Sequence, residues 1–103
     1  MKVAERNGQA VYKIDSNHPA DGRRILQLLF VSTDPSHSTD AWFLCLTRIP
    51  TFNADGDAEG IRVVPAWLRA GDADWGEPPP CIVEEFEEEI RCFLSELKLR
   101  GMW

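Results

Sequence analysis

Residues 80–101, PCIVEEFEEEIRCFLSELKLRG, decide the fold. On a helical wheel their apolar side chains gather on about a third of the circumference, and every glutamate lies outside that arc. Pro80 can occupy a first helical turn without losing a hydrogen bond, and Gly101 can close the helix in the left-handed conformation. We therefore predict one amphipathic helix over residues 81–100, with Leu99 opposite its apolar arc. The arc consists of Ile82, Val83, Phe86, Ile90, Phe93, Leu94 and Leu97.

The preceding chain must supply an apolar surface, because a lone amphipathic helix has nothing to bury its arc against. Residues 24–32 and 41–49 are apolar on both alternating faces, and their β-branched and aromatic content favours central strands. Asn7-Gly8 lies between two short alternating runs and predicts a first hairpin. Pro65 cannot donate to a strand ladder, so its strand either lies at an edge or ends at Val64 before a helical turn over residues 65–70.

These elements predict one α+β domain spanning residues 1–103. We expect an antiparallel meander of four to five strands within residues 2–68, a proline-rich irregular connector over 69–80, and the helix across one face. The middle strands are apolar on both faces, so the second face also needs a cover. It can be covered by the sheet curling into a partial barrel, by residues 67–75 folding over, or by a second protein.

The composition excludes several classes of function. A chain of 103 residues that is 44% hydrophobic suits a single core. Its formal net charge of −6 opposes direct binding to nucleic acid and to anionic membranes. The chain has no apolar run of signal-peptide or membrane-spanning length, so we expect a cytoplasmic protein. Arg23-Arg24, the one adjacent basic pair, is interpreted as the solvated start of a strand rather than a phosphate site.

Residues 53–60 place oxygen-bearing side chains at alternate positions, as a calcium loop does at its start. The glycine and the final acid of such a loop are missing, which favours an acidic hairpin tip over a metal site. Three widely spaced cysteines lack the spacing of a metal site and are expected to be reduced, mostly packed thiols. We expect neither a metal nor a cofactor.

His18 and His37 each lie near acidic residues, and either could be combined with a serine or Cys45 into a nucleophilic site. The sequence contains no nucleophile elbow, HExxH motif, phosphate-binding loop or dinucleotide fingerprint. We therefore expect that the protein is not an enzyme.

Three acidic patches, within residues 55–59, 72–77 and 84–89, and four tryptophans favour a role in binding another protein. Our leading hypothesis is a small non-catalytic protein-binding domain, of the inhibitor, immunity, counter-defence or adaptor type, that occludes a partner with a basic surface. The alternatives are a small-ligand-binding domain with a pocket between sheet and helix and, less favoured, an enzyme using a loop histidine. The uncovered sheet face also leaves room for a homodimer. The predicted contact residues are Trp67, Trp75, Trp103, Asp55, Asp57, Glu59, Glu84 and Glu88.

Overall fold

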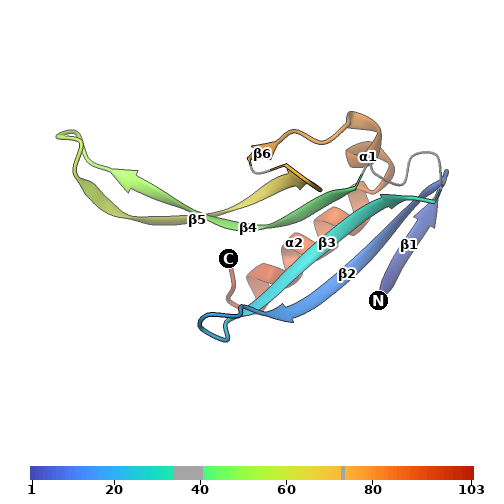
Figure 1. The fold of residues 1–103 in the computed structure, drawn as a ribbon, viewed down its shortest axis with the longest axis horizontal. Helices are drawn as coiled ribbons and strands as arrows, with labels where there is room; N and C mark the ends of the chain where they lie inside the picture. Colours follow the sequence, from blue (N-terminus) through green and yellow to red (C-terminus); the bar gives the residue numbers. More distant parts are fainter. Residues whose placement is uncertain (34–40, 73) are drawn as a thin grey trace.

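An antiparallel sheet carries a C-terminal helical segment in the computed structural model, which describes residues 1–33, 41–72 and 74–103 (Figure 1). The strands lie in chain order, each hydrogen-bonded to the next. The predicted α+β class, antiparallel meander and C-terminal helical segment are confirmed. The elements are β1 (Lys2–Arg6), β2 (Gln9–Asn17), β3 (Arg24–Ser32), β4 (Trp42–Phe52), β5 (Ala58–Arg69), β6 (Trp75–Gly76), α1 (Pro80–Glu85) and α2 (Glu87–Leu99).

The described part of the chain forms six strands, and the prediction of four to five was therefore too low. The additional strand is β6, whose Trp75 and Gly76 pair with Leu68 and Trp67 of β5. It falls within the predicted irregular connector, because a two-residue strand leaves no alternating pattern to detect. The sheet stays open, with β1 and β6 at its two edges, and does not close into a barrel.

The hairpins follow local turn chemistry. Asn7 and Gly8 have φ values of 49° and 78°, as a tight turn between β1 and β2 requires, and the predicted first hairpin is confirmed. β2 then pairs with β3 along the whole length of both strands. Residues 34–40, between β3 and β4, lie outside the described residues.

β5 continues through Pro65 to Arg69, so of the two predicted alternatives the edge strand is confirmed and the strand end at Val64 with a helical turn over residues 65–70 is wrong. Pro65 is paired with Leu46 of β4 on one side. On its other side β5 meets β6 only at Trp67 and Leu68. The outer edge of β5 is therefore unpaired at Pro65, and the missing N–H costs the ladder nothing.

The core lies between α2 and the face of the sheet that carries Val11, Leu28 and Leu44. The Phe30 ring is central, with its centroid 5.7 Å from that of Phe86 and 5.2 Å from that of Trp67. Most of the predicted helical arc contributes to this core. The buried cluster consists of Val11, Leu26, Leu28, Phe30, Leu44, Ile82, Phe86, Phe93 and Leu97, with Ala4, Trp42, Leu46, Trp67, Ile90, Leu94 and Met102 packed against it.

The helical segment is interrupted at Phe86, which corrects the prediction of a single helix over residues 81–100. Phe86 has φ −114° and ψ 27°, outside the helical region, and its ring is fully buried. Val83 of α1 does not belong to the buried cluster of the core. Val83 is 39% exposed although it was predicted within the buried arc.

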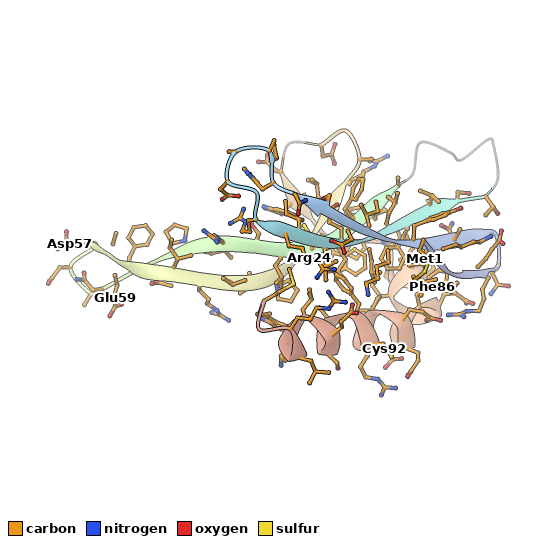
Figure 2. The ribbon with its side chains drawn as sticks, turned by 90° about the horizontal axis from the view of Figure 1, so that it is seen from below. Met1, Arg24, Asp57, Glu59, Phe86 and Cys92 are labelled. Atoms are coloured by element: carbon orange, nitrogen blue, oxygen red, sulfur yellow. The ribbon has the colours of Figure 1, made fainter. Side chains whose placement is uncertain are left out.

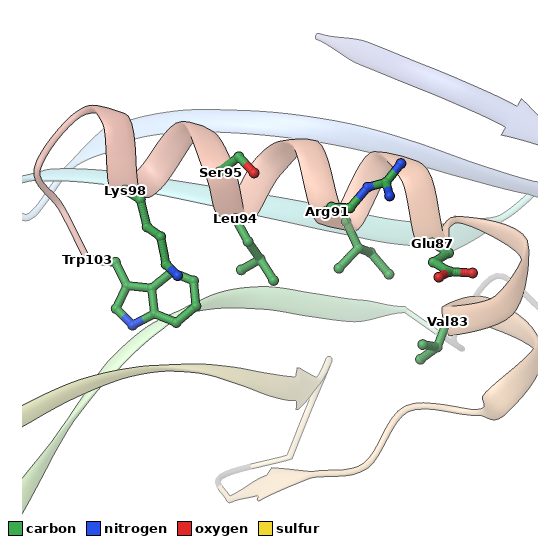
Figure 3. Close-up of a pocket in the computed structure, with 8 residues that line it drawn as sticks. Val83, Glu87, Arg91, Leu94, Ser95, Lys98 and Trp103 are labelled. Carbon is green, nitrogen blue, oxygen red and sulfur yellow. The ribbon is translucent and has the colours of Figure 1, made fainter.

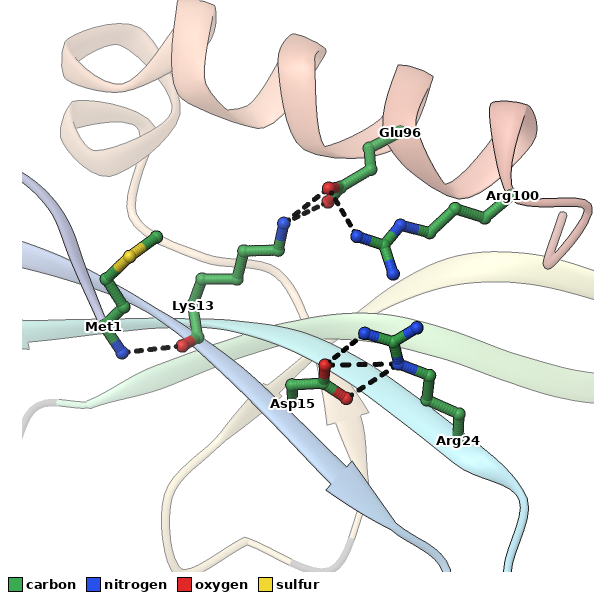
Figure 4. Close-up of polar contacts among 6 residues, drawn as sticks. All are labelled: Met1, Lys13, Asp15, Arg24, Glu96 and Arg100. Carbon is green, nitrogen blue, oxygen red and sulfur yellow. Dashed lines mark hydrogen bonds and ion pairs between the residues drawn. The ribbon is translucent and has the colours of Figure 1, made fainter.

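Two glutamates of α2 face the sheet. The expectation that every glutamate of the helix faces solvent is therefore wrong. Arg6 Nη2 donates to Glu89 Oε1 at 2.5 Å. Lys13 Nζ donates to Glu96 Oε1 at 2.6 Å, as Figure 4 shows. These hydrogen bonds lower the pKa of both carboxyl groups. Both pairs fasten α2 to β1 and β2 at the margin of the core.

Candidate functional site

A two-stranded ribbon projects from the sheet (Figure 1). We call it the arm, and it comprises residues 46–52 of β4, residues 58–65 of β5 and the turn between them. β3 pairs with β4 only from Gln27↔Cys45 to Phe30↔Trp42, so beyond Cys45 the arm strands pair only with each other. The arm makes the molecule 49 × 27 × 25 Å, with a radius of gyration of 15.3 Å. A compact domain of this length would have a radius of about 13 Å.

Apolar residues on the core-facing side of β4 and β5 continue along the arm, where they are exposed to solvent. Leu44 is buried beneath α2, and every second residue of β4 beyond it shares its face. On that face Leu46 pairs with Pro65 and Pro50 with Ile61. Ile61 is 66% exposed and Phe52, two residues beyond Pro50, is 60% exposed. The opposite face adds Ile49, which is 46% exposed.

Both edges of the arm are protected by proline. Because proline has no N–H, the pairs Leu46↔Pro65 and Pro50↔Ile61 must be non-hydrogen-bonded pairs, whose N–H positions point outward. Pro50 and Pro65 therefore each remove a donor from a free edge. Prolines at such positions hinder pairing with a further strand. The faces of the arm, rather than its edges, are thus available for contacts.

The tip of the arm is an ordered acidic turn. The side-chain oxygen of Asn53 accepts the N–H groups of Asp55 and Asp57, each at 3.0 Å. Gly56, with φ 84°, donates its N–H to the Asn53 carbonyl oxygen at 3.0 Å. The carboxylates of Asp55, Asp57 and Glu59 are left in solvent. Among the described residues no cluster of three or more potential ligands could hold a metal ion.

The predicted contact residues do not gather on one surface. Asp57 and Glu59 lie at the tip of the arm, far from Phe86 (Figure 2), and Asp55 belongs to the same turn. Trp67 packs against Phe30 in the core, and Trp75 is exposed on β6. The remaining members, Glu84 of α1, Glu88 of α2 and Trp103 at the chain end, are exposed elsewhere.

Trp103 borders a shallow groove along α2 (Figure 3). The groove has a volume of about 360 Å³, and the ammonium of Lys98 lies 4.4 Å from the centroid of the Trp103 ring. Ile90 and Leu94 form its apolar wall, with Val83 toward α1. Trp103 therefore lies beside an apolar strip that is separate from the acidic tip of the arm.

His18, the histidine that the structure describes, makes its polar contacts within its own turn. His18 Nδ1 accepts the N–H of Ala20 at 3.1 Å and lies 3.5 Å from Asp21 Oδ1. Asp15, the other acid considered for it, instead binds the Arg24 guanidinium. His37 lies outside the described residues.

The cysteines are free thiols, as expected, but their packing was predicted wrongly. Cys45 is half-buried, and burial raises its pKa. Cys81 and Cys92 are both exposed.

Comparisons of this chain with protein-family models, with curated proteins and with solved structures give no match. Within the described residues no helix has the length and apolar character to cross a membrane. The arm was not anticipated from the sequence. Its clearest signal was the presence of prolines at positions 50 and 65, within two alternating runs joined by a polar turn.

Proposed function

We propose that the protein is a non-catalytic protein-binding domain that occludes a surface of its partner with the arm. The observation that carries this proposal is the exposure of Ile49, Phe52 and Ile61 on a ribbon held away from the core. Single exposed apolar residues are ordinary, whereas several on one projecting element are typical of interaction surfaces. A ribbon with unpaired edges is also a poor stabilising element by itself, so its length calls for another explanation.

We infer the kind of partner surface from the chemistry of the arm. Its exposed apolar residues fit a groove wide enough for two strands, and the acidic tip would then meet a basic surface at the end of that groove. Of the residues predicted to make contacts, Asp55, Asp57 and Glu59 belong to this surface. The proposal gives Trp67 no contact role because its ring is packed against Phe30. It requires no cofactor, metal, nucleic acid or membrane.

The test compares an arm variant with a matched control. Tagged wild-type protein, a Phe52→Ser/Ile61→Ser variant and a Leu99→Ser variant are purified from the cells that produce the protein, and bound proteins are quantified by mass spectrometry. Leu99 is 89% exposed on α2, so the control removes an exposed apolar side chain outside the arm. We expect one stoichiometric partner that wild type and Leu99→Ser retain and the double variant loses.

Two further measurements complete the test. The Asp55→Asn/Asp57→Asn variant should bind the same partner more weakly at low salt and with a smaller salt dependence. Sedimentation velocity of the purified protein tests whether the partner is a second copy, as the predicted homodimer requires. Equal retention of every protein by all variants would contradict the assignment of binding to the arm.

A further inference from the structure

A cleft of about 890 Å³ lies between the start of β3, the base of the arm and the C-terminal end of α2. Its lining combines apolar side chains with guanidinium groups. Leu26 is buried and belongs to the core, whereas Leu46, Val63 and Met102 are only partly buried. The basic residues that line the cleft are Arg23, Arg24, Arg48 and Arg100.

This concentration of positive charge stands out in an acidic protein. Four of the eight arginines of the chain line one cleft, while the formal net charge is −6. Figure 4 shows Arg100 reaching from the end of α2 toward β3, where Arg24 lies across from it. Arg24 is bound to Asp15, and Arg100 to Glu96 at 3.2 Å. These two guanidinium groups are therefore held in place.

The other two arginines are not neutralised in this way. Within the described part of the chain, Arg23 and Arg48 have no ion-pair partner. The charges of both arginines affect the carboxyl group of Asp21. Its pKa is lowered first by the N–H of Arg23, which donates to its carboxylate at 2.9 Å, and further by the charges of His18, Arg23 and Arg48. Two guanidinium groups thus remain available to a ligand.

We infer that this cleft binds an amphipathic organic anion, a carboxylate or phosphate group on an apolar body. Guanidinium groups bind both head groups through paired N–H donors, and Arg23 and Arg48 would supply these donors. The apolar body would lie against Leu46, Val63 and Met102. The volume falls within the roughly 300–1,000 Å³ of small-molecule sites. The inference goes beyond the proposed function, because it needs neither the tip nor the exposed apolar residues of the arm.

Titration with octanoate, octyl phosphate, octanol and inorganic phosphate tests the inference, with NMR shifts of the arginine Nε–H groups and of the Leu46 and Met102 methyl groups as the readout. We expect saturable shifts at the cleft with octanoate or octyl phosphate, and the tighter of the two identifies the head group. Octanol lacks the anionic head group, and inorganic phosphate lacks the apolar body. Both should bind at least about tenfold more weakly.

Charge-matched variants locate the site. Arg48→Gln and Arg23→Gln should each weaken octanoate binding by about tenfold, because each removes a charged donor. Arg91→Gln makes the same change on the exposed side of α2 and should leave the affinity unchanged. Circular dichroism of each variant verifies that it is folded. Absence of shifts at the cleft, octanol binding as tightly as octanoate, or an equal loss in Arg91→Gln would overturn the inference.

Discussion

The body and the arm of this molecule use the same alternating pattern and reach opposite outcomes. In the body, formed by β1 to β3, the inner parts of β4 and β5, β6 and the helices, Leu28 and Leu44 are buried beneath α2. In the arm, the continuation of the same face ends in Ile61 and Phe52, both largely exposed. The difference arises because β3 pairs with β4 only as far as Cys45, so neither β3 nor α2 accompanies the arm. Alternation therefore specifies the two faces of a strand but not how much of either face is covered.

The largest expected effect comes from a matched pair of phenylalanines. Phe86→Ala should lower the free energy of unfolding by about 3–5 kcal/mol, because it leaves a cavity against Phe30 in the core. Phe52→Ala in the arm should change it by no more than about 0.5 kcal/mol. Urea denaturation followed by tryptophan fluorescence measures both values. Equal losses would mean that the arm is part of the core.

Lowering the pH should destabilise the body of the protein, because the carboxyl groups with lowered pKa values join α2 to β1 and β2. The pKa values of Glu89 and Glu96 are lowered in the folded protein by hydrogen bonds from Arg6 and Lys13. The unfolded chain therefore binds more protons, and stability that is fully present above the ordinary carboxyl pKa is lost as pH falls through the lowered values. We expect the melting temperature to decline below about pH 4.

Variants that replace a carboxylate by an amide separate the contributions of the body and the arm to this decline in melting temperature. Glu96→Gln should flatten the pH dependence, because the ion pair to Lys13 is then absent at every pH. Asp55→Asn removes a carboxylate at the tip that makes no ion pair with any described residue, and its curve should parallel that of wild type. Thermal unfolding between pH 7 and pH 3 measures all three curves. A curve as steep in Glu96→Gln as in wild type would assign the acid-sensitive contact to Glu89 with Arg6, which this variant keeps, and after it to Asp15 with Arg24.

Shortening the arm should have a smaller effect on stability. Replacing residues 50–61 by Asn-Gly joins Ile49 to Arg62, which are directly paired, through a tight hairpin turn. We expect a change of no more than about 1 kcal/mol in the free energy of unfolding, because a two-stranded ribbon has little stability of its own. The variant should lose the partner of the arm and keep the arginine-lined cleft, whose Arg48 and Val63 it retains. An unfolded product would show that the body depends on the arm.

Local chemistry accounts for what the sequence predicted well. The Asn7-Gly8 turn, the apolar arc of the C-terminal helical segment and the acidic turn near residue 55 each depend on neighbouring residues alone. The missed features depend on partners that are distant in sequence. Glu96 faces the sheet, where it binds Lys13, and the arm projects because β4 diverges from β3 beyond Cys45, although β3 itself continues to Arg24. The candidate site was therefore predicted only at its acidic tip, and its apolar faces were not.

The smallest expected change in stability comes from restoring an edge donor to the arm. Pro50→Val returns an outward N–H to β4 and should change the free energy of unfolding by no more than about 0.5 kcal/mol, because that N–H has no partner within the molecule. It should nevertheless increase self-association, since the edge can now pair with the edge of a second copy. Thr51→Val is the control, because the N–H of Thr51 points toward β5 by the alternation of the ladder. Sedimentation velocity across a concentration series compares both variants with wild type. If Thr51→Val associated as strongly as Pro50→Val, the added apolar side chain rather than the restored donor would be the cause, and Pro50 would have no protective role at the edge.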